Sequence, residues 1–561
     1  MKKLICSKIY TSLSMKIEHL SPEILESLIE IPEHAQYGDF ALPCFIFAKQ
    51  LKKNPAEIAM ELQCHFQSKY IEKTEAVGPY LNIFINRALF AEKIVSIIGS
   101  NDRWGGNLHN TKTALVEHTS INPNASPHIG RARNAFIGSA IVNLLRFSGY
   151  QVDVHYFVND IGKQISMLVY KLKDKKDIVF EELLSEYVKI NELMKDNPSI
   201  ETEVFNQLVR LENGDESMIR QFRRIVDICM NGQVNLFNEL NIYYDYFDYE
   251  SKYITSGRTS EIIELLKKSG KLFEDSDQRY VLNLDAFELE QNMLPLTRAD
   301  KTSLYPLRDI CFNIDKSMQK KEKNIVVLGE DQLLYGKQIN AALEILGFSV
   351  PEIVNYSFVI LADGKMSSRA GNVVLLKDVM EKAIEKTDKM FFERNGIHDL
   401  NKAKVIAYGA IKYAILSCGF NKNVMFDWDR ILSLQGNSIL FLQYNYARIS
   451  KLKKNYFETD EDVKNLDFSS LKNDDEWLLL KTIFNFKAEL NDILQNHYQI
   501  SALTNYLYSI TQIFSKWYHD TPILRDHNKG RLAMRMWIAE KTGDIIRNGL
   551  EILGIEVLEE I

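Results

Sequence analysis

The chain is 561 residues long, 46% of them hydrophobic and 25% charged, and its net charge at pH 7 is −7. This length predicts several domains rather than one. The acidic total excludes a wholly basic nucleic-acid coat protein, although it leaves room for a local basic face.

The six cysteines are scattered without a C-x-x-C pair. This spacing predicts neither a zinc site nor a disulfide framework, and it favours a reducing compartment. No apolar run approaches the roughly 18 residues that span a membrane, and the N-terminal segment lacks the apolar core of a signal peptide. We therefore expect a cytoplasmic protein that does not enter a membrane.

Residues 1–108 are predicted to form a small α+β domain. Asn54 and Pro55 are typical of a helix start, and Ile58 and Leu62 recur at helical spacing after them. The stretch "AVGPYLNIFIN" predicts a strand after a Gly-Pro turn. The polar segment "GSNDRWGGNLHNTK" closes the domain.

Residues 109–395 contain two strand-helix-strand patterns. The first is "TALVEHTS", "RNAFIGSAIVNLLRFSGYQ" and "VDVHYFV"; the second is "NIVVLG", "QINAALEILGF" and "EIVNYSFVIL". Parallel strands need a crossover helix between them. The two halves therefore predict one Rossmann-like, doubly wound parallel sheet that binds a nucleotide, with a helix-rich insertion at about 160–290.

Residues 396–561 read as nearly all helix, since Leu, Ile, Tyr and Phe recur at three- and four-residue spacing with few glycines. We expect an all-α bundle here. The fold class predicted for the chain is therefore a multidomain α/β protein with an α+β N-terminal domain and an all-α C-terminal domain.

The stretch "EHTSINPNASPHIGRARNAFIG" joins the first strand to its helix. Pro123 and Pro127 end the strand, because neither can donate to a ladder. The helix is expected to begin near Ile129–Arg131, and a helix N-terminus favours anionic oxygens. His128 stands just before it, where an imidazole can hydrogen-bond a phosphate. Alone, this pattern is also compatible with a structural capping turn.

The stretch "DGKMSSRAGNVVLL" follows the second half of the sheet. Lys365 lies in a Gly-flanked loop beside Ser367, Ser368 and Arg369, and cations with hydroxyl donors suit a triphosphate that releases pyrophosphate. Together with His-Ile-Gly in the first half, this loop predicts a shared ATP site. "GEDQLLYGKQ" is rejected as a P-loop, because six residues separate its glycines and Gln338 replaces the magnesium-binding hydroxyl.

These two motifs are the signatures of class I aminoacyl-tRNA synthetases, and the chain resembles the arginyl members of that family over essentially its full length. "YFVNDIGKQI", "YPLRDICFNIDK", "FDWDRILSLQGNSILFLQYNYARI" and "FSKWYHDTPIL" resemble further blocks of the family in its order. The N-terminal region resembles the family's extra domain, which packs on the tRNA elbow, and the helical C-terminal region resembles its anticodon-binding bundle.

The resemblance implies site residues in three groups. Those implied to hold arginine are Glu117, Asn122, Tyr305, Asp309 and Gln332. Those implied to bind ATP are His128, Gly130, Arg131, Lys365, Met366, Ser367 and Ser368, with His128 and Lys365 as catalytic phosphate stabilisers. Those implied to contact tRNA are Tyr446, Arg448 and Trp517. No metal ligand is implied among the side chains.

The guanidinium of arginine presents five donors in a rigid fork, so carboxylates suit it. The alternative for Asp309 is a surface helix carboxylate paired with Arg308 or Lys316. Unstacked anticodon bases suit exposed aromatic side chains beside basic ones. The alternative for Tyr446 and Trp517 is a place in the core of the bundle.

The implied activity is that of an arginine–tRNA ligase with ATP, L-arginine and tRNA(Arg) as substrates and Mg²⁺ as an aid. In this family activation generally requires bound tRNA, and the chain is expected to be a monomer. Most of the rate enhancement in such a reaction comes from positioning the substrates and from stabilising the charge that develops.

Two positions depart from the family pattern. Arg131 stands where the family's His-x-Gly-His has its second histidine, and "GNSILFLQY" lacks the Gly-Pro turn that the family has there. These departures give a little support to a second hypothesis, a catalytically silent paralogue that binds tRNA in regulation, which the filled ATP motifs and arginine-pocket positions disfavour. A third hypothesis is a class I synthetase of another specificity, which the acidic and amide residues of the implied pocket disfavour.

Overall fold

The computed structural model describes residues 6, 10, 21–32, 34–63, 69–107, 111–361, 374–427, 431–433, 436–456 and 466–561. The chain divides into two compact units. Unit 1 consists of Met1–Asp102, Leu452–Phe484 and Ile513–Thr542, and unit 2 of Arg103–Lys451, Asn485–Gln512 and Gly543–Ile561.

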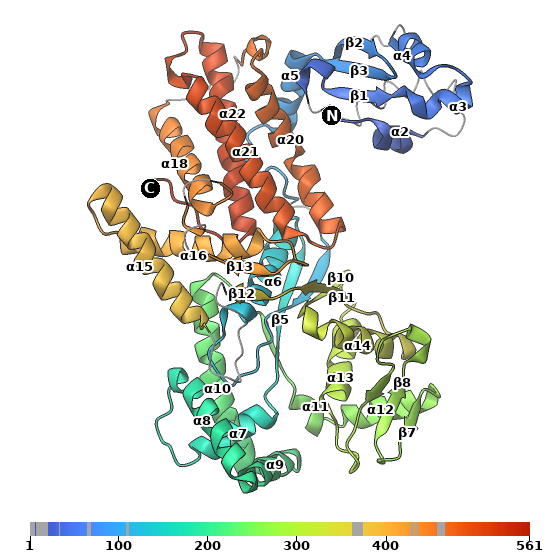
Figure 1. The fold of residues 1–561 in the computed structure, drawn as a ribbon, viewed down its shortest axis with the longest axis vertical. Helices are drawn as coiled ribbons and strands as arrows, with labels where there is room; N and C mark the ends of the chain where they lie inside the picture. Colours follow the sequence, from blue (N-terminus) through green and yellow to red (C-terminus); the bar gives the residue numbers. More distant parts are fainter. Residues whose placement is uncertain are drawn as a thin grey trace. The chain divides into compact units, whose positions relative to one another are not determined.

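The N-terminal part of unit 1 is an α+β domain, as predicted (Figure 1). Its strands form an antiparallel sheet in the order β1-β3-β2, and Asn54 caps helix α4 by accepting from the Ala56 amide at 2.9 Å. The elements are α2 (Pro22–Leu28), β1 (Phe40–Pro43), α3 (Ala48–Leu51), α4 (Pro55–Gln63), β2 (Ile71–Val77), β3 (Tyr80–Ile85) and α5 (Arg87–Ile98).

The main sheet of unit 2 has five parallel strands in the order β11-β10-β4-β5-β6. From the β4–β10 junction, α6 leads outward to β5 in one direction and α14 leads to β11 in the other. The predicted doubly wound fold is confirmed. The elements are β4 (Thr113–Glu117), α6 (Ile129–Phe147), β5 (Gln151–Val158), β6 (Tyr246–Tyr249), β10 (Lys323–Gly329), α14 (Leu333–Ile345) and β11 (Glu352–Tyr356).

Strand β6 lies inside the range 160–290 that we expected to be a single insertion. The sequence "YFDY" carries no regular alternation, and three of its four residues are exposed because β6 is at the edge of the sheet. The range therefore consists of a helical segment before β6 and, after it, two helices and two strands of a small sheet, whose third strand, β9, follows the range. These later elements are α11 (Lys252–Thr255), α12 (Arg258–Lys268), β7 (Leu272–Glu274), β8 (Tyr280–Asn283) and β9 (Met293–Pro295).

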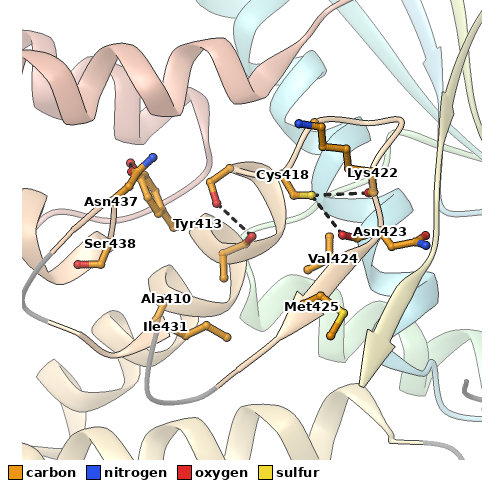
Figure 2. A pocket seen from close by; sticks show the side chains of 13 residues that line it. Ala410, Tyr413, Cys418, Lys422, Asn423, Val424, Met425, Ile431, Asn437 and Ser438 are labelled. Carbon is orange, nitrogen blue, oxygen red and sulfur yellow. Dashed lines mark hydrogen bonds between the residues drawn. The ribbon is translucent and has the colours of Figure 1, made fainter. Parts of the chain in front are cut away.

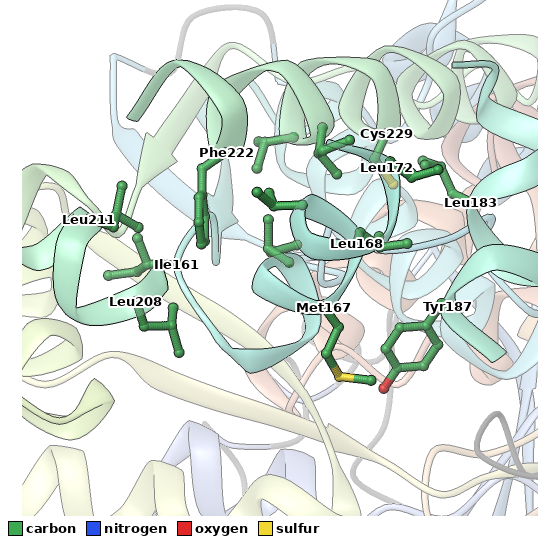
Figure 3. Packing of buried hydrophobic residues seen from close by; sticks show 14 of the residues in the cluster. Ile161, Met167, Leu168, Leu172, Leu183, Tyr187, Leu208, Leu211, Phe222 and Cys229 are labelled. Atoms are coloured by element: carbon green, nitrogen blue, oxygen red, sulfur yellow. The ribbon is translucent and has the colours of Figure 1, made fainter. Parts of the chain in front are cut away.

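The helical segment before β6 packs against the sheet through its own apolar core (Figure 3). Phe222 and Cys229 of α10 share this core with Leu168 of α7, and the core continues into Tyr156 and Val158 of β5. Burial of these apolar faces holds the segment to the strand that ends at the candidate site. The helices are α7 (Lys163–Leu172), α8 (Leu183–Asp196), α9 (Pro198–Glu212) and α10 (Glu216–Glu239).

The C-terminal part of the chain is mainly helical, as predicted. Three long helices, α20 to α22, each contribute residues to both units. The elements after β11 are β12 (Val359–Leu361), α15 (Leu376–Asn395), α16 (Leu400–Leu416), β13 (Val424–Phe426), α18 (Ile439–Asn455), α20 (Asp474–Gln495), α21 (Ile500–Asp520) and α22 (Lys529–Ile552). Within the described ranges, no helix is both long enough and apolar enough to cross a membrane.

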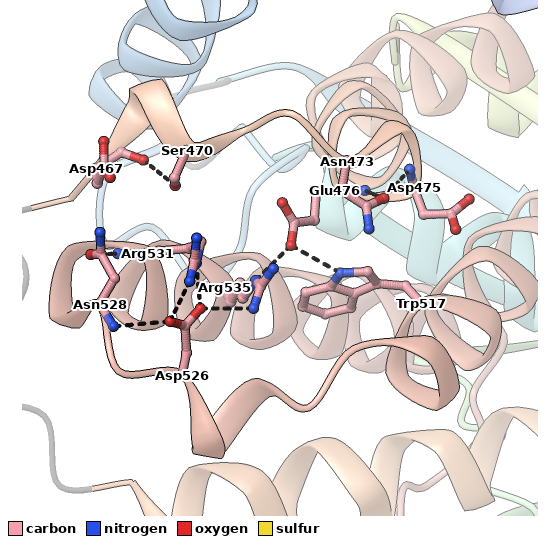
Figure 4. A network of polar contacts seen from close by, with 10 residues as sticks. All are labelled: Asp467, Ser470, Asn473, Asp475, Glu476, Trp517, Asp526, Asn528, Arg531 and Arg535. Carbon is pink, nitrogen blue, oxygen red and sulfur yellow. Dashed lines mark hydrogen bonds and ion pairs between the residues drawn. The ribbon is translucent and has the colours of Figure 1, made fainter.

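A buried polar network closes the C-terminal part of unit 1 (Figure 4). Asp526 accepts from Nε of Arg531 at 2.5 Å and from Nη1 of Arg535 at 2.8 Å. Arg535 also donates through Nε to Glu476 at 2.6 Å, and Nε1 of Trp517 donates to the same oxygen at 3.3 Å. The carboxylates thereby fix the turn before α22 to the start of α20.

Trp517 has no exposed surface in this network. A base can stack on an aromatic ring only if one face of the ring is open. The alternative stated for this residue, a place in the core of the bundle, therefore holds, and its burial argues against the predicted contact with tRNA.

Replacing Asp526 with asparagine is expected to destabilise the protein by about 3 kcal/mol, because two guanidinium groups lose their shared anion. The hydrogen bond from Arg531 lowers the pKa of Asp526 to about 2. The contribution is therefore complete above the unfolded-state pKa and is lost as the pH falls toward 2. The melting temperatures of wild type and Asp526→Asn should converge as the pH falls toward 2. The exposed variant Asp520→Asn should keep the melting temperature of wild type at every pH.

Candidate active site

The candidate site lies at the carboxyl ends of the parallel strands, at the junction of β4 and β10. There the crossovers leave in opposite directions, which is where ligands bind in open α/β sheets. β4 ends at Glu117, and α13 (Tyr305–Met318) precedes β10 and carries Asp309. The implied arginine-binding residues come from β4, from the loop after it, from α13 and from the turn after β10.

The loop after β4 has an unusual backbone that the surrounding structure holds. Thr119 and Ser120 have positive φ angles of 71° and 41°. Such a conformation costs free energy in non-glycine residues and persists where neighbours impose it. Asn134 of α6 accepts from the Thr119 amide at 2.5 Å, and the hydroxyl of Tyr156 accepts from the Ile121 amide at 3.1 Å.

Close packing of α6 on this loop also depends on Gly138. A Cβ atom at this position would lie 2.2 Å from Cγ of His118, which is buried after β4. Gly138 is therefore needed for α6 to lie close to the loop that contains His118.

Asp309 is not the surface carboxylate of the alternative interpretation. Its Oδ2 accepts from the hydroxyl of Tyr335 at 2.8 Å, and its Oδ1 accepts from Nδ2 of Asn313 at 2.8 Å. Burial, together with the negative charge of Glu117, raises the pKa of Asp309 to about 6. The two cations considered as partners bind elsewhere: Arg308 pairs with Glu250 and Lys316 with Glu117.

Glu117 and Asp309 thus form a pair of carboxylates within electrostatic range of each other. Tyr305 begins α13 with 55% of its surface exposed, and its ring centroid is 5.2 Å from that of Tyr335. Asn122 donates to Gln164 at 3.0 Å. Among the described residues, neither Asn122 nor Gln332 hydrogen-bonds the carboxylate pair.

Three residues of this site were not predicted. Asn313 and Lys316 stand four and seven residues after Asp309 on the same helix, a spacing that places all three on one face. Tyr335 lies in the stretch that we rejected as a P-loop. The helical spacing could have indicated Asn313 and Lys316, but no local pattern indicated that Tyr335 would reach Asp309.

Helix α6 begins at Ile129, as predicted, and His128 is its N-cap. Nδ1 of His128 accepts from the Arg131 amide at 3.3 Å, so the ring proton is on Nε2. Burial, and secondarily the charge of Arg131, lowers the pKa of His128 to about 4. At neutral pH the imidazole is therefore uncharged and can donate one hydrogen bond through Nε2.

The segment around His128 is hydrogen-bonded to the residues that follow the Lys365 loop. The Ile129 amide donates to the Val374 carbonyl at 3.1 Å, and the Leu376 amide donates to the Pro127 carbonyl at 2.9 Å. Four residues of the predicted ATP site lie outside the described residues, namely Lys365, Met366, Ser367 and Ser368, and so does Arg369. Val374 and Leu376, which follow these residues in the chain, nevertheless adjoin the start of α6.

Three protein-family models match successive parts of the chain. They describe an arginyl tRNA synthetase N terminal domain at residues 7–85, a catalytic domain of class I (R) tRNA synthetases at 93–428 and a DALR anticodon binding domain at 442–561. The arginine–tRNA ligase of Methanococcus aeolicus is 32% identical, over 96% of this chain and 97% of its own length. The chain belongs to the arginyl-tRNA synthetase family.

A second curated relative supports the same family, and two solved structures support the same fold. The arginine–tRNA ligase of Methanocaldococcus jannaschii is also 32% identical, over 96% of this chain and 97% of its own length. The arginyl-tRNA synthetase of Thermus thermophilus superposes with a TM-score of 0.81 at 22% identity, covering both chains completely. That of Plasmodium falciparum superposes with a TM-score of 0.79 at 18% identity, over 100% of this chain and 99% of its own. These two structures show a shared fold.

In this member of the arginyl-tRNA synthetase family, Arg133 connects α6 to the residues before β12 and β13. The side chain is fully buried. Nη1 donates to the carbonyl of Ser357 at 2.5 Å and of Lys422 at 2.9 Å, and Nη2 donates to that of Gly419 at 3.0 Å. Ser357 precedes β12, and Lys422 precedes its partner β13.

Replacing Arg133 with methionine is expected to destabilise the protein by about 3 kcal/mol, because several buried carbonyls lose their donor. The matched control is Arg146→Met on the same helix. Arg146 is partly exposed and pairs with Asp245 at 3.3 Å, so its loss should cost less than about 1 kcal/mol. Chemical denaturation measures both, and equal losses would contradict the role assigned to Arg133.

A cavity of about 270 Å³ adjoins the segment that Arg133 holds (Figure 2). Tyr413, Cys418 and Asn437 line it, and the Cys418 thiol lies 3.6 Å from the carbonyls of Lys422 and Asn423. Of the predicted site residues that the structure describes, none lines this cavity.

The other two residues predicted to contact tRNA, Tyr446 and Arg448, lie on α18. Tyr446 and Arg448 are both partly exposed. The Arg448 guanidinium lies 4.3 Å from the ring centroid of Tyr444, a cation–π contact that leaves an aromatic and a basic group side by side. This arrangement is compatible with base stacking but does not require it.

Proposed function

We infer that this protein is an arginine–tRNA ligase. The observation that carries the inference is the match to curated arginine–tRNA ligases at 32% identity over nearly the full length of both chains. In this reaction the carboxylate of arginine attacks the α-phosphorus of ATP, which gives arginyl-adenylate and pyrophosphate. A hydroxyl of the 3′-terminal ribose of tRNA(Arg) then takes the arginyl group and releases AMP.

The arginine pocket is proposed to contain Glu117, Asn122, Tyr305, Asp309 and Gln332. The closeness of Glu117 and Asp309 supports this, since two carboxylates at the carboxyl ends of the strands can receive a cationic side chain. The guanidinium would meet Asp309, whose Oδ2 is already held by Tyr335. Burial strengthens each of these interactions relative to water.

The ATP site is proposed to contain His128, Gly130, Arg131, Lys365, Met366, Ser367 and Ser368. His128 would donate from Nε2 to a phosphate oxygen as a neutral imidazole, and the N-terminus of α6 would favour the negative charge. Lys365 would stabilise the leaving pyrophosphate. Arg131, which is partly exposed next to His128, keeps a positive charge where the family has a histidine.

Mg²⁺ is proposed to enter as a complex with ATP. In the described ranges, no group of three or more His, Cys, Asp or Glu side chains could hold a metal ion. Mg²⁺ commonly binds through substrate phosphates together with one or two carboxylates.

Binding of tRNA is proposed to involve Tyr446 and Arg448 of α18, the family's anticodon-binding region at 442–561 and the N-terminal domain at 1–108. The proposed domain bounds are those expected from the sequence, with the catalytic domain at 109–395 and the helical domain at 396–561. We further propose that the protein is a monomer and that it is cytoplasmic. Size-exclusion chromatography with light scattering would test the monomeric state.

Pyrophosphate exchange with each amino acid, with and without tRNA, tests the proposed function. Exchange that depends on arginine and on tRNA(Arg) is expected. Absence of arginine-dependent exchange in the presence of cognate tRNA, with tRNA binding retained, would instead support the silent paralogue. Exchange with another amino acid would support a different specificity.

A further inference from the structure

Lys316 is buried against Glu117 of the proposed arginine pocket without having been predicted there. Its side chain is 1% exposed, and its Nζ lies 2.5 Å from Oε2 of Glu117. The ammonium group is also 4.6 Å from the ring centroid of Phe312 on the same helix. Among the described residues, Glu117 is the one carboxylate within ion-pair distance of Lys316.

A buried lysine costs free energy unless an anion compensates it. Here the compensating anion is a residue that the proposed function assigns to substrate binding. Oε2 of Glu117 therefore already accepts one hydrogen bond before arginine arrives, and Oε1 is left for the substrate.

The charges of the pocket depend on this pair. Glu117 and Asp309 each carry −1 when ionised and Lys316 carries +1, so the three together carry −1. Glu117 raises the pKa of Asp309 and Lys316 lowers it. The other polar groups near Asp309 are Tyr305, Asn313, Tyr335 and, farther away, Glu250. Of these, only Glu250 adds a charge, and it is paired with Arg308.

We propose that Lys316 is a positioning and specificity-determining residue, which fixes Glu117 and sets the pocket to a single net negative charge that matches one guanidinium group. The proposal rests on the proposed function. Without Lys316, two unpaired carboxylates would share one recess, and one of them would take up a proton. The pocket would then hold arginine less well and would distinguish it less from the uncharged analogue citrulline.

The test measures pyrophosphate exchange with cognate tRNA and saturating ATP, as a function of arginine concentration and pH. Lys316→Met is expected to raise the KM for arginine at least 10-fold, to change kcat less than 3-fold and to move the pH midpoint of KM up by about one unit. Lys316→Arg should restore both values to within 3-fold and 0.3 pH units of wild type. Lys321→Met, which breaks a pair with Asp153 outside the pocket, is the matched control.

A double variant separates charge from a merely structural role. Glu117→Gln/Lys316→Met removes one negative and one positive charge, so Asp309 alone sets the pocket at −1. The KM for arginine should stay high, because a carboxylate is lost, but the pH midpoint should return toward that of wild type. The two neutral side chains also tolerate burial, so this variant serves if Lys316→Met does not fold.

An unchanged KM and pH midpoint in folded Lys316→Met would overturn the proposal. A midpoint raised by a full unit in the double variant would also overturn it. Failure of wild type to catalyse arginine-dependent exchange would instead refute the proposed function, so the two failures are distinguishable.

Discussion

Replacing Asp309 with asparagine is expected to raise the KM for arginine about 100-fold, because a buried hydrogen bond between two charged groups contributes up to about 3 kcal/mol. The side chain keeps its shape, and Oδ1 can still accept from Asn313 as it does in the wild type. We expect kcat to fall much less, since the carboxylate would bind arginine in the ground state and in the transition state alike. Initial rates of pyrophosphate exchange over a range of arginine concentrations measure both constants.

The pH dependence of the wild-type enzyme provides a second test of Asp309. Its pKa is raised to about 6 by burial and by Glu117. The carboxyl is therefore ionised at neutral pH and takes up a proton below about pH 6, where the KM for arginine should rise. Asp309→Asn should lack this rise, while Asp227→Asn on the exposed surface of α10 should retain it. An unchanged KM in Asp309→Asn would remove this residue from the pocket.

Replacing His128 with alanine is expected to lower kcat about 100-fold, because the α-phosphate loses a preorganised hydrogen-bond donor. Binding of tRNA should change little. Since the imidazole is uncharged at neutral pH, its contribution should be independent of pH between about 6 and 8. Single-turnover formation of arginyl-adenylate measures the effect directly.

His128 also caps α6, so a second variant is needed to separate the two roles. Asparagine is a good N-cap and can accept from the Arg131 amide as Nδ1 of His128 does. His128→Asn should therefore keep the melting temperature of wild type and still lose about 100-fold in kcat. Wild-type turnover in His128→Asn would show that this residue acts only as a cap.

Local sequence patterns were sufficient to predict the elements that have a regular apolar period. The apolar stretches of β4, β5 and β10 and the period of α6 predicted the doubly wound sheet, because hydrophobic period and crossover length restrict such a fold strongly. The start of α6 at His128 followed from the proline-bounded loop before it. The prediction did not include β6, a four-residue edge strand whose polar, exposed residues carry no periodic signal.

The residues of the candidate site divide in the same way. Glu117, His128 and Asp309 were named from motifs and resemblance, and their neighbours along the helices lie where a period of 3.6 residues places them. The partners that determine their chemistry come from distant parts of the chain. Lys316 is 199 residues from Glu117, and Tyr335 is 26 residues from Asp309.

The amino-acid sequence by itself determined most of the order of the strands and helices, the start of α6 at His-Ile-Gly, and the resemblance to a synthetase family. These features depend on local periodicity and on short motifs, which a chain carries without reference to its fold. Tertiary structure alone decided that Trp517 is buried, that Arg133 joins α6 to β12 and β13, and that Lys316 neutralises Glu117. Burial and ion pairing depend on which distant segments meet, and that is established only when the chain packs.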